Sequence, residues 1–312
     1  MANSSLIMNA RVEPAPAPQA RAARAQVPLR GIALMIASTL FFACGDVLAK
    51  ALASSLPAAE IVFLRYATLA VLLLPFVLRS AGRAELRSQR PGLQVLRGLG
   101  MVGSALCFTL GLPFLPVADA TAIYFISPIV ITALAMLFLG EKVGWRRWTA
   151  SLIGLLGVLI VMRPGTGAFQ AAALLPLLGA TCWAGAAIAT RVMSGTDRPI
   201  TTLAYSAVVG LAVLAALVPF SWVTPTWLEL GLAIAMGVLS SVGHGLVVLA
   251  YRETSASVVA PFSYGQLIWA AALGFAAFGA LPDRFTVAGA VIIAASGLYT
   301  AYRERVRAAG SA

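Results

Sequence analysis

The sequence predicts an all-α membrane protein of ten transmembrane helices, arranged as two inverted repeats of five helices. Hydrophobic residues make up 60% of the 312 residues and charged residues 11%, and the mean hydropathy is +0.92. A soluble domain needs a polar surface that this composition cannot supply. Apolar stretches of about 20 residues recur from residue 31 to the C-terminus, each long enough to cross a hydrocarbon layer of about 30 Å.

Charged residues and prolines separate the apolar stretches, and each stretch is interpreted as one span. The predicted spans are residues 31–51, 58–79, 93–114, 117–139, 147–162, 171–190, 200–222, 228–250, 256–280 and 285–302. These stretches are apolar on every face, whereas the strands of a membrane barrel alternate between polar and apolar residues. A helical membrane protein is therefore the predicted class.

The basic residues predict the orientation of the spans. Arg163 and Arg284 are the only basic residues on one side, Lys50 and Arg65 fall inside spans, and the rest of the 22 lie on the other side. Basic residues near span ends are retained in the cytoplasm. We therefore expect both termini in the cytoplasm, and residues 1–29 and 304–312 form the predicted cytoplasmic tails, the first of them disordered.

The net charge of +11 is explained by this bias and by attraction to anionic headgroups, so no nucleic acid partner is expected. Cys44, Cys107 and Cys182 all lie within spans and share no short spacing, which is typical of small apolar packing residues. His244 is the single histidine, and no carboxylate or cysteine pair has the spacing of metal ligands. We expect neither a metal site nor a cofactor.

An internal repeat relates the two halves of the chain at an offset of about 140 residues. The segment Ala-Asp-Ala-Thr-Ala-Ile-Tyr-Phe-Ile-Ser-Pro (118–128) parallels Ser-Ala-Ser-Val-Val-Ala-Pro-Phe-Ser-Tyr (255–264), and Gly157 aligns with Gly297. Residues 30–165 form the first predicted repeat and 170–303 the second. Because each repeat holds an odd number of spans, the second inserts upside down, as in many secondary transporters.

Several of these segments resemble the drug/metabolite transporter superfamily, specifically its EamA-type carriers with two EamA domains. The residues that carry the resemblance are Phe-Ile-Ser-Pro (125–128), Phe-Leu-Gly-Glu-Lys-Val-Gly (138–144), Arg-Arg-Trp (146–148), Arg-Pro-Gly (163–165) and Ala-Pro-Phe-Ser-Tyr-Gly-Gln-Leu-Ile-Trp (260–269). The resemblance covers residues 30–303 and implies transport of a small organic molecule. The second repeat has Phe-Gly-Ala-Leu-Pro-Asp (278–283) where the family usually carries a Glu after the Gly.

Ionisable residues inside the spans are candidates for function, because a charge at membrane depth needs a partner or a water-filled path. Asp46 and Lys50 stand at i and i+4 on one helical face, in the favourable acid-first order. Arg65 reaches the same level on the second span, and Glu60 begins that span. We expect these four to form a charge network or gate at the outer mouth of a cavity. The alternative is an ion-paired staple between the first two spans, with Lys50 extending to the interface.

A second polar layer is predicted below this network, in positions that inverted symmetry relates. The candidate substrate-binding residues are Tyr124, Ser127, Trp183, His244, Tyr264, Gln266 and Trp269. Aromatic and amide groups around one cavity suit an organic ligand. Packing or interfacial anchoring is the alternative role for each aromatic residue.

Pro128 and Pro261 occupy paired positions in the two repeats and are predicted to interrupt the fourth and ninth spans. Each proline frees a backbone carbonyl. Breaks of this kind lie beside the substrate path in carriers and allow rocking, so we expect hinges here. A kink that serves packing alone is the other interpretation. The Gly-Ala-Ala-Ile-Ala segment (185–189) leaves a homodimer contact open.

Two other classes of function were weighed. Ser240 or Ser241 with His244 has the spacing of a nucleophile and base, which would make the protein an intramembrane enzyme. No Gly-x-Ser-x-Gly motif surrounds the pair, and an enzyme leaves the inverted repeat unexplained. A channel would show flux that does not saturate with substrate. The expected function is a carrier, not an enzyme.

The resemblance implies the EamA-type branch that includes S-adenosylmethionine and riboflavin uptake carriers, rather than amino-acid or drug efflux. Both ligands join a flat heterocycle to a polar tail, and aromatic rings can hold the heterocycle. The excess of cations over anions in the predicted charge network disfavours a cationic substrate. The sequence therefore favours riboflavin uptake, with S-adenosylmethionine uptake and amino-acid or drug efflux as alternatives.

Overall fold

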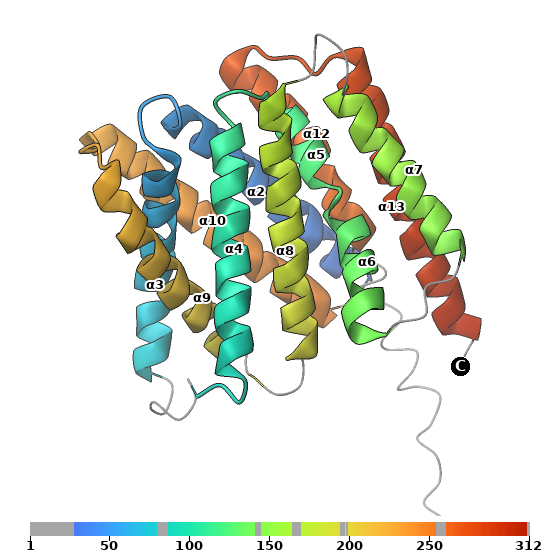
Figure 1. Ribbon diagram of the computed structural model, residues 1–312, viewed down its shortest axis with the longest axis horizontal. Helices are drawn as coiled ribbons and strands as arrows, with labels where there is room; N and C mark the ends of the chain where they lie inside the picture. The colour runs from blue at the N-terminus through green and yellow to red at the C-terminus, as the bar shows by residue number, and fades with distance from the viewer. Residues whose placement is uncertain are drawn as a thin grey trace, which may run out of the picture.

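The computed structural model describes residues 28–79, 87–140, 145–163, 170–193, 197, 199–253 and 260–310, and their regular structure is entirely helical (Figure 1). Seven stretches in this part of the chain are long and apolar enough to cross a membrane, and three shorter apolar helices cover Leu152–Met162, Phe262–Phe278 and Arg284–Tyr299. The all-α membrane fold of ten spans is confirmed. The predicted disordered tail, residues 1–29, lies almost wholly outside the described residues.

The first half of the chain supplies five spans. They are α2 (Pro28–Leu52), α3 (Ala58–Arg79), α4 (Pro91–Gly111), the pair α5 (Val117–Tyr124) and α6 (Ser127–Leu139), and α7 (Trp145–Met162). Helices suit this environment because each satisfies its backbone hydrogen bonds internally. The fourth span is broken between α5 and α6, just before Pro128.

The second half repeats this order. It runs through α8 (Leu174–Val192, after the short turn η2 at Ala171–Ala173), α9 (Pro199–Leu217, extended by η3 at Val218–Phe220), α10 (Trp227–Glu253), η4 (Ala260–Tyr264) with α12 (Gly265–Phe278), and α13 (Arg284–Gly310). The tail predicted at 304–312 is helical as far as Gly310, because α13 continues through it.

The helices pair in a way that inverted repeats require. Helix α2 of the first half packs along α10 of the second, and α8 of the second half packs along α4 of the first. The contacts of α12 with α2 and of α6 with α8 form a second matched pair, and α7 packs along α13. The first and last described helices, α2 and α13, have their chain ends at the same face of the bundle (Figure 1).

Glycines set the closest helix crossings. A Cβ on Gly289 of α13 would lie 2.5 Å from the carbonyl oxygen of Gly157 on α7, and one on Gly100 of α4 would lie 2.9 Å from the carbonyl oxygen of Cys182 on α8. These distances leave no room for a side chain, so the backbones touch directly. Glycine in the third span, at Gly100, therefore allows α4 to approach α8 closely.

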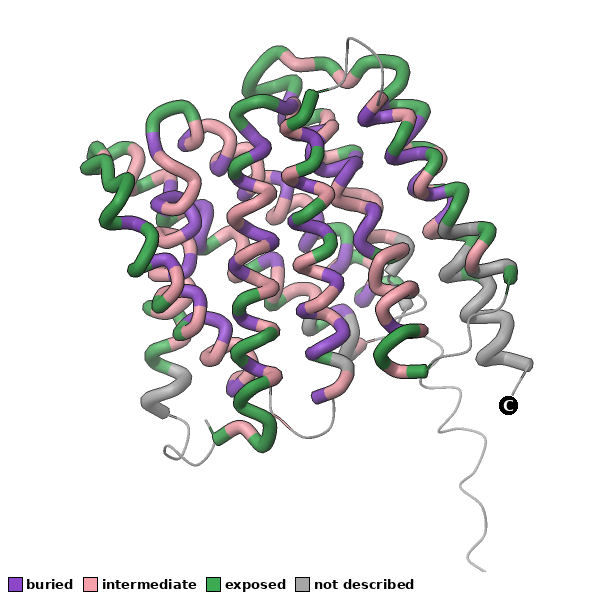
Figure 2. The backbone as a smooth tube through the Cα atoms, viewed as in Figure 1, coloured by how far each residue is buried: buried purple, intermediate pink, exposed green. Residues whose placement is uncertain are grey.

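The outer surface of the bundle is apolar. Buried residues follow the inward faces of the helices and exposed residues the outside and the two ends (Figure 2). Large hydrophobic residues remain exposed along the spans, among them Leu137 (69%), Phe138 (72%) and Ile268 (71%). An exposed apolar surface of this kind fits contact with lipid rather than water.

Candidate functional site

Asp46 lies at the centre of the helix bundle. Its Oδ2 accepts a hydrogen bond of 2.9 Å from Nε2 of Gln266, which links α2 of the first half to α12 of the second. Asp46 is half-buried between α2 and α12, which pack against each other. The sequence predicts the two residues in different layers, whereas the structure joins them.

Tyr124, His244 and Ser104 extend this cluster. The hydroxyls of Tyr124 and Ser104 are 2.7 Å apart and join α5 to α4. Nδ1 of His244 is 2.8 Å from the carbonyl oxygen of Ser240 on its own helix. The ring of Phe42 on α2 meets the imidazole edge to face, with 4.9 Å between centroids. Tyr124 and His244 are half-buried, so each presents an accessible edge.

Arg65 on α3 supplies positive charge to this region, and Arg97 on α4 also acts on His244. Its guanidinium acts electrostatically on Asp46, on Tyr124 and on His244, and it lies 5.9 Å from the ring centroid of Tyr66. No carboxylate among the described residues stands within salt-bridge distance of it. We call Asp46, Arg65, Ser104, Tyr124, His244 and Gln266 the central polar cluster.

The predicted pairing of Lys50 with Asp46 is wrong. Nζ of Lys50 donates hydrogen bonds to the carbonyl oxygens of Leu112 at 3.1 Å and Leu115 at 2.5 Å. These acceptors follow the end of α4, where carbonyl groups lose their partners within the helix. The long side chain of Lys50 therefore extends away from Asp46 and ties α2 to the loop after α4.

Glu60 is also separate from the central polar cluster. Its Oε2 accepts a hydrogen bond of 3.0 Å from the backbone N–H of Val223, and the residue is fully buried. This contact ties the start of α3 to the segment before α10. The predicted four-residue network is thus divided into three separate contacts, of which only Asp46 and Arg65 belong to the centre.

The two broken spans meet at their breaks. Phe125 follows α5 and Tyr264 ends η4, and their rings pack with centroids 5.0 Å apart. The Tyr264 side chain also lies against α13, where a Cβ on Gly297 would stand 1.8 Å from the tyrosine hydroxyl. Tyr264 therefore occupies space that only glycine leaves open.

The prolines lie where the helices are interrupted. Pro128 is in the first turn of α6, and Pro261 is in the 3₁₀ segment η4. Ser127 begins α6 and is buried. The breaks predicted for the fourth and ninth spans are present, while movement about them stays a prediction. Trp183 on α8 and Trp269 on α12 are half-buried, and no ring contact in the described part of the chain joins either to the other candidates.

A group of polar contacts that the sequence analysis missed closes the face opposite the chain ends. Oγ1 of Thr286 donates to Oδ1 of Asp119 at 2.9 Å, joining α13 to α5. Arg163, after α7, forms a salt bridge of 2.7 Å with Asp283, before α13. The charge of Lys50 also acts on Asp119. We call Asp119, Arg163, Asp283 and Thr286 the distal clamp.

Asp283 also caps α13. Its Oδ1 accepts hydrogen bonds from the backbone N–H groups of Phe285 at 3.1 Å and Thr286 at 2.8 Å, the arrangement of a helix N-cap. Burial alone would raise the pKa of Asp283, but hydrogen bonds from Thr286 and the charge of Arg163 outweigh it and hold the pKa below its usual range.

The face that carries the chain ends has its own contacts between the two halves. Asp197 accepts hydrogen bonds from Ser88 at 2.5 Å, from the N–H of Gln89 at 3.0 Å and from Gln94 at 2.7 Å. Burial raises the pKa of Asp197, but these hydrogen bonds outweigh it and the pKa is lowered. Arg97 donates to Thr190 on α8 at 2.8 Å and also to Ser206 on α9. We call Ser88, Gln94, Arg97 and Asp197, with their partners, the proximal clamp.

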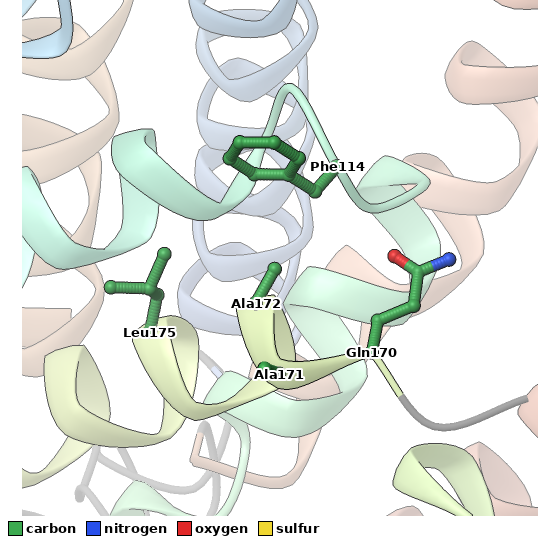
Figure 3. Close-up of a pocket in the computed structure, with 5 residues that line it drawn as sticks. All are labelled: Phe114, Gln170, Ala171, Ala172 and Leu175. Atoms are coloured by element: carbon green, nitrogen blue, oxygen red, sulfur yellow. The ribbon is translucent and has the colours of Figure 1, made fainter.

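A pocket of about 530 Å³ opens at the end of the bundle opposite the chain ends, lined by Phe114, Gln170, Ala171, Ala172 and Leu175 (Figure 3). Phe114 comes from the loop after α4, and the other lining residues belong to η2 and its flanks. None of the predicted site residues lines it. Among the described residues, no group of three or more histidine, cysteine, aspartate or glutamate side chains is arranged to hold a metal ion.

Comparison with known proteins gives a consistent result over the whole bundle. The sequence profile of the EamA-like transporter family matches residues 29–163 and again 170–302. The S-adenosylmethionine uptake transporter of Rickettsia bellii (strain RML369-C) is 32% identical over 275 residues, which cover 88% of this chain and 94% of that protein.

Other relatives carry different names. The pseudopaline exporter CntI of Pseudomonas aeruginosa (strain UCBPP-PA14) is 31% identical and covers 84% of this chain and 93% of its own length. The riboflavin transporter of Vibrio cholerae serotype O1 is 31% identical, and the match covers 86% of this chain and 92% of that protein. A crystal structure of a protein 18% identical superposes with a TM-score of 0.62 over 88% of this chain and 98% of that one, which shows a shared fold.

Proposed function

The chain belongs to the EamA-like transporter family and is a secondary transporter of a small metabolite, and we propose that it takes up a heterocyclic metabolite by alternating access. The observation that carries this proposal is the central polar cluster. It draws Asp46 from α2, Arg65 from α3 and Gln266 from α12, so both halves of the chain contribute to one site. A site between two repeats near mid-membrane is where carriers bind their substrates.

The substrate candidates are riboflavin, which the sequence analysis favours, and S-adenosylmethionine. Relatives named for each of them cover most of this chain. The half-buried rings of Tyr124, Tyr264 and Trp269 supply flat surfaces that can hold a heterocycle. Gln266 and His244 supply polar groups for its edge. The mid-depth Trp183 and the buried Ser127 are further candidates on neighbouring helices.

The two clamps support alternating access. The distal clamp joins Asp119 and Arg163 of the first half to Thr286 and Asp283 of the second. At the opposite face, the proximal clamp joins Gln94, with other residues on and just before α4, to residues of the second half. A carrier must open one face while the other stays closed, so each clamp breaks in turn. The span breaks at Phe125 and Tyr264 lie between them and serve as hinges.

We place the protein in the cytoplasmic membrane with both termini in the cytoplasm. Arg30 and Arg90 stand at the starts of α2 and α4, at the face with the chain ends, whereas Arg163 and Arg284 stand at the end of α7 and the start of α13, at the other face (Figure 1). This distribution matches the retention of basic residues on the cytoplasmic side. The distal clamp then faces outward. Homodimer formation remains a proposal that rests on the small-residue segment 185–189 alone.

We assign no enzymatic role to the serine and histidine residues of α10. The hydroxyl of Ser241 donates to the carbonyl oxygen of Gly237 at 2.8 Å, and Nδ1 of His244 lies against the carbonyl of Ser240. Each group bonds to the backbone of its own helix, whereas a catalytic dyad needs the hydroxyl and the imidazole bonded to each other.

Uptake into proteoliposomes tests the proposal. We expect labelled riboflavin or S-adenosylmethionine to enter vesicles that contain the purified protein, with a rate that saturates as substrate rises. Replacement of Gln266 by Ala should lower the rate, while replacement of Gly245, whose added Cβ would meet nothing within 4 Å, by Ala should not. Flux that rises linearly with substrate would identify a channel instead, and efflux of amino acids without uptake of either compound would overturn the assignment.

A further inference from the structure

The acid of the central polar cluster is incompletely paired. A carboxylate offers several lone-pair positions for hydrogen bonds. Among the described residues, Gln266 alone donates a hydrogen bond to Asp46, and the cation predicted beside it, Lys50, is held by the carbonyls of Leu112 and Leu115. The single partner of Asp46 is therefore a neutral amide that can turn aside.

The arginine of the cluster has a neutral neighbour, Tyr66, rather than an acidic one. Arg65 is half-buried, and no carboxylate of the described residues forms a salt bridge with it. Its guanidinium is a planar group with several donors that matches a carboxylate in two-point contact. Asp46 and Arg65 act on each other through space, but no hydrogen bond joins them in the described part of the chain.

Asp46 and Arg65 carry opposite charges that act on each other, yet no salt bridge joins them in the described part of the chain. This arrangement defines a requirement for the ligand. A neutral ligand leaves the charges of both Asp46 and Arg65 without a partner at membrane depth. A ligand with a single charge still leaves one of the two unpaired. We infer that the site selects a zwitterion, whose cationic group meets Asp46 in place of Gln266 and whose carboxylate meets Arg65. This inference rests on the proposed function and names the substrate class of the same site.

The aromatic residues extend the requirement. The charges of Asp46 and Arg65 both act on Tyr124. Phe125, the next residue, packs against Tyr264 at the span break with the two rings tilted. A ligand that joins an amino-acid group to an aromatic heterocycle places its charged end on Asp46 and Arg65 and its ring toward these side chains. S-adenosylmethionine has this chemistry, and its sulfonium adds a second positive charge, whereas riboflavin has neither charge.

The experiment compares ligands that carry different charged groups. Uptake of labelled S-adenosylmethionine is measured in proteoliposomes with the wild-type protein. The competitors are S-adenosylhomocysteine, which lacks the sulfonium, adenosine, which lacks the amino-acid group, and riboflavin. We expect S-adenosylhomocysteine to compete and adenosine and riboflavin to compete about tenfold more weakly or worse.

Variants connect the selectivity to the two charges. Asp46→Asn and Arg65→Gln should weaken zwitterion uptake by about tenfold or more and reduce the advantage over adenosine. Asp46→Glu keeps the charge and should restore that advantage, which separates charge from folding. Glu229→Gln, in the first turn of α10, is the control with one charge removed outside the site and should behave as wild type.

Three results would overturn the inference in different ways. If the wild-type protein takes up riboflavin and Asp46→Asn leaves that uptake unchanged, the proposed carrier function stands and the requirement for a zwitterion fails. If none of the four compounds enters vesicles or competes, the proposed substrate class fails and the inference fails with it. A folded Asp46→Asn protein with unchanged preference for S-adenosylmethionine would also refute the role of Asp46.

Discussion

Asp283 offers a quantitative test of the distal clamp. Its carboxylate caps α13 through the N–H groups of Phe285 and Thr286 and also forms the salt bridge with Arg163. The cap orients the first turn of α13, and that turn holds Thr286 against Asp119. Two substitutions separate these roles, because Asn caps a helix about as well as Asp but carries no charge.

The expected magnitudes follow from these contacts. Asp283→Ala removes the cap, typically about 1 kcal/mol, and the salt bridge, about 0.2 to 1 kcal/mol because the Asp283 side chain is 43% exposed. The sum is about 1 to 2 kcal/mol of unfolding free energy. Asp283→Asn removes the salt bridge alone and should lose at most about 1 kcal/mol.

Thermal unfolding of the detergent-solubilised protein measures the difference. We expect the midpoint to fall for Asp283→Ala and to fall much less for Asp283→Asn, with Arg163→Gln matching Asp283→Asn. If Asp283→Asn were as unstable as Asp283→Ala, the charge rather than the cap would hold α13. Equal midpoints for all variants and the wild type would refute both roles.

The lowered pKa of Asp283 sets the pH dependence of the same comparison. A carboxylate whose pKa is lower in the folded state contributes stability above its unfolded pKa of about 3.9 and loses that contribution as the pH falls through the folded value. The gap between wild type and Asp283→Asn should therefore be constant above about pH 5 and narrow below about pH 3.9. A gap that widened in acid would contradict the sign of the shift.

Three further predictions follow from the contacts between the halves. Cysteines can be placed at Asp119 and Thr286 in a protein whose native cysteines are replaced by serine. Oxidation of this pair to a disulfide should block uptake, and reduction should restore it. Uptake by the oxidised protein would show that transport does not require the distal clamp to open. Gly297→Ala should displace Tyr264 and lower uptake, since the added Cβ would lie 1.8 Å from its hydroxyl; unchanged uptake with a lower thermal midpoint would make Tyr264 a packing residue. Pro128→Ala should slow uptake more than it reduces expression, and the reverse order would argue against a hinge.

The helices could be predicted well because the membrane fixes their length. The second span was predicted at residues 58–79 and is α3, Ala58–Arg79. The fourth was predicted as one span at 117–139, with an interruption at Pro128, and the structure breaks it into α5 and α6. Hydropathy predicts that a segment lies in lipid, and a proline predicts where its helix can be interrupted. Neither predicts how many residues leave the helix at that interruption.

The charged contacts were harder to predict because side chains choose among acceptors that are distant in sequence. The i to i+4 rule paired Lys50 with Asp46 on one helix face, yet Lys50 reaches carbonyl oxygens 62 and 65 residues away. Those carbonyls end a helix and lack partners within it, so they attract a cation strongly. Asp119 lies within the quoted repeat motif, but its partner Thr286 is 167 residues away, and no local rule connects them.

The depth of polar groups also depends on the broken spans. Counting residues along a regular helix at 1.5 Å per residue placed Gln266 below Asp46. The ninth span begins with the 3₁₀ segment η4, from Ala260 to Tyr264, which rises about 2.0 Å per residue and carries Gln266 further than a regular helix would. Its amide bonds to Asp46. The same break that makes α12 a candidate for movement therefore brings its amide to the acid. Any rocking of α12 about Tyr264 must change the contact between Gln266 and Asp46, and this couples the occupancy of the site to the conformation of the carrier.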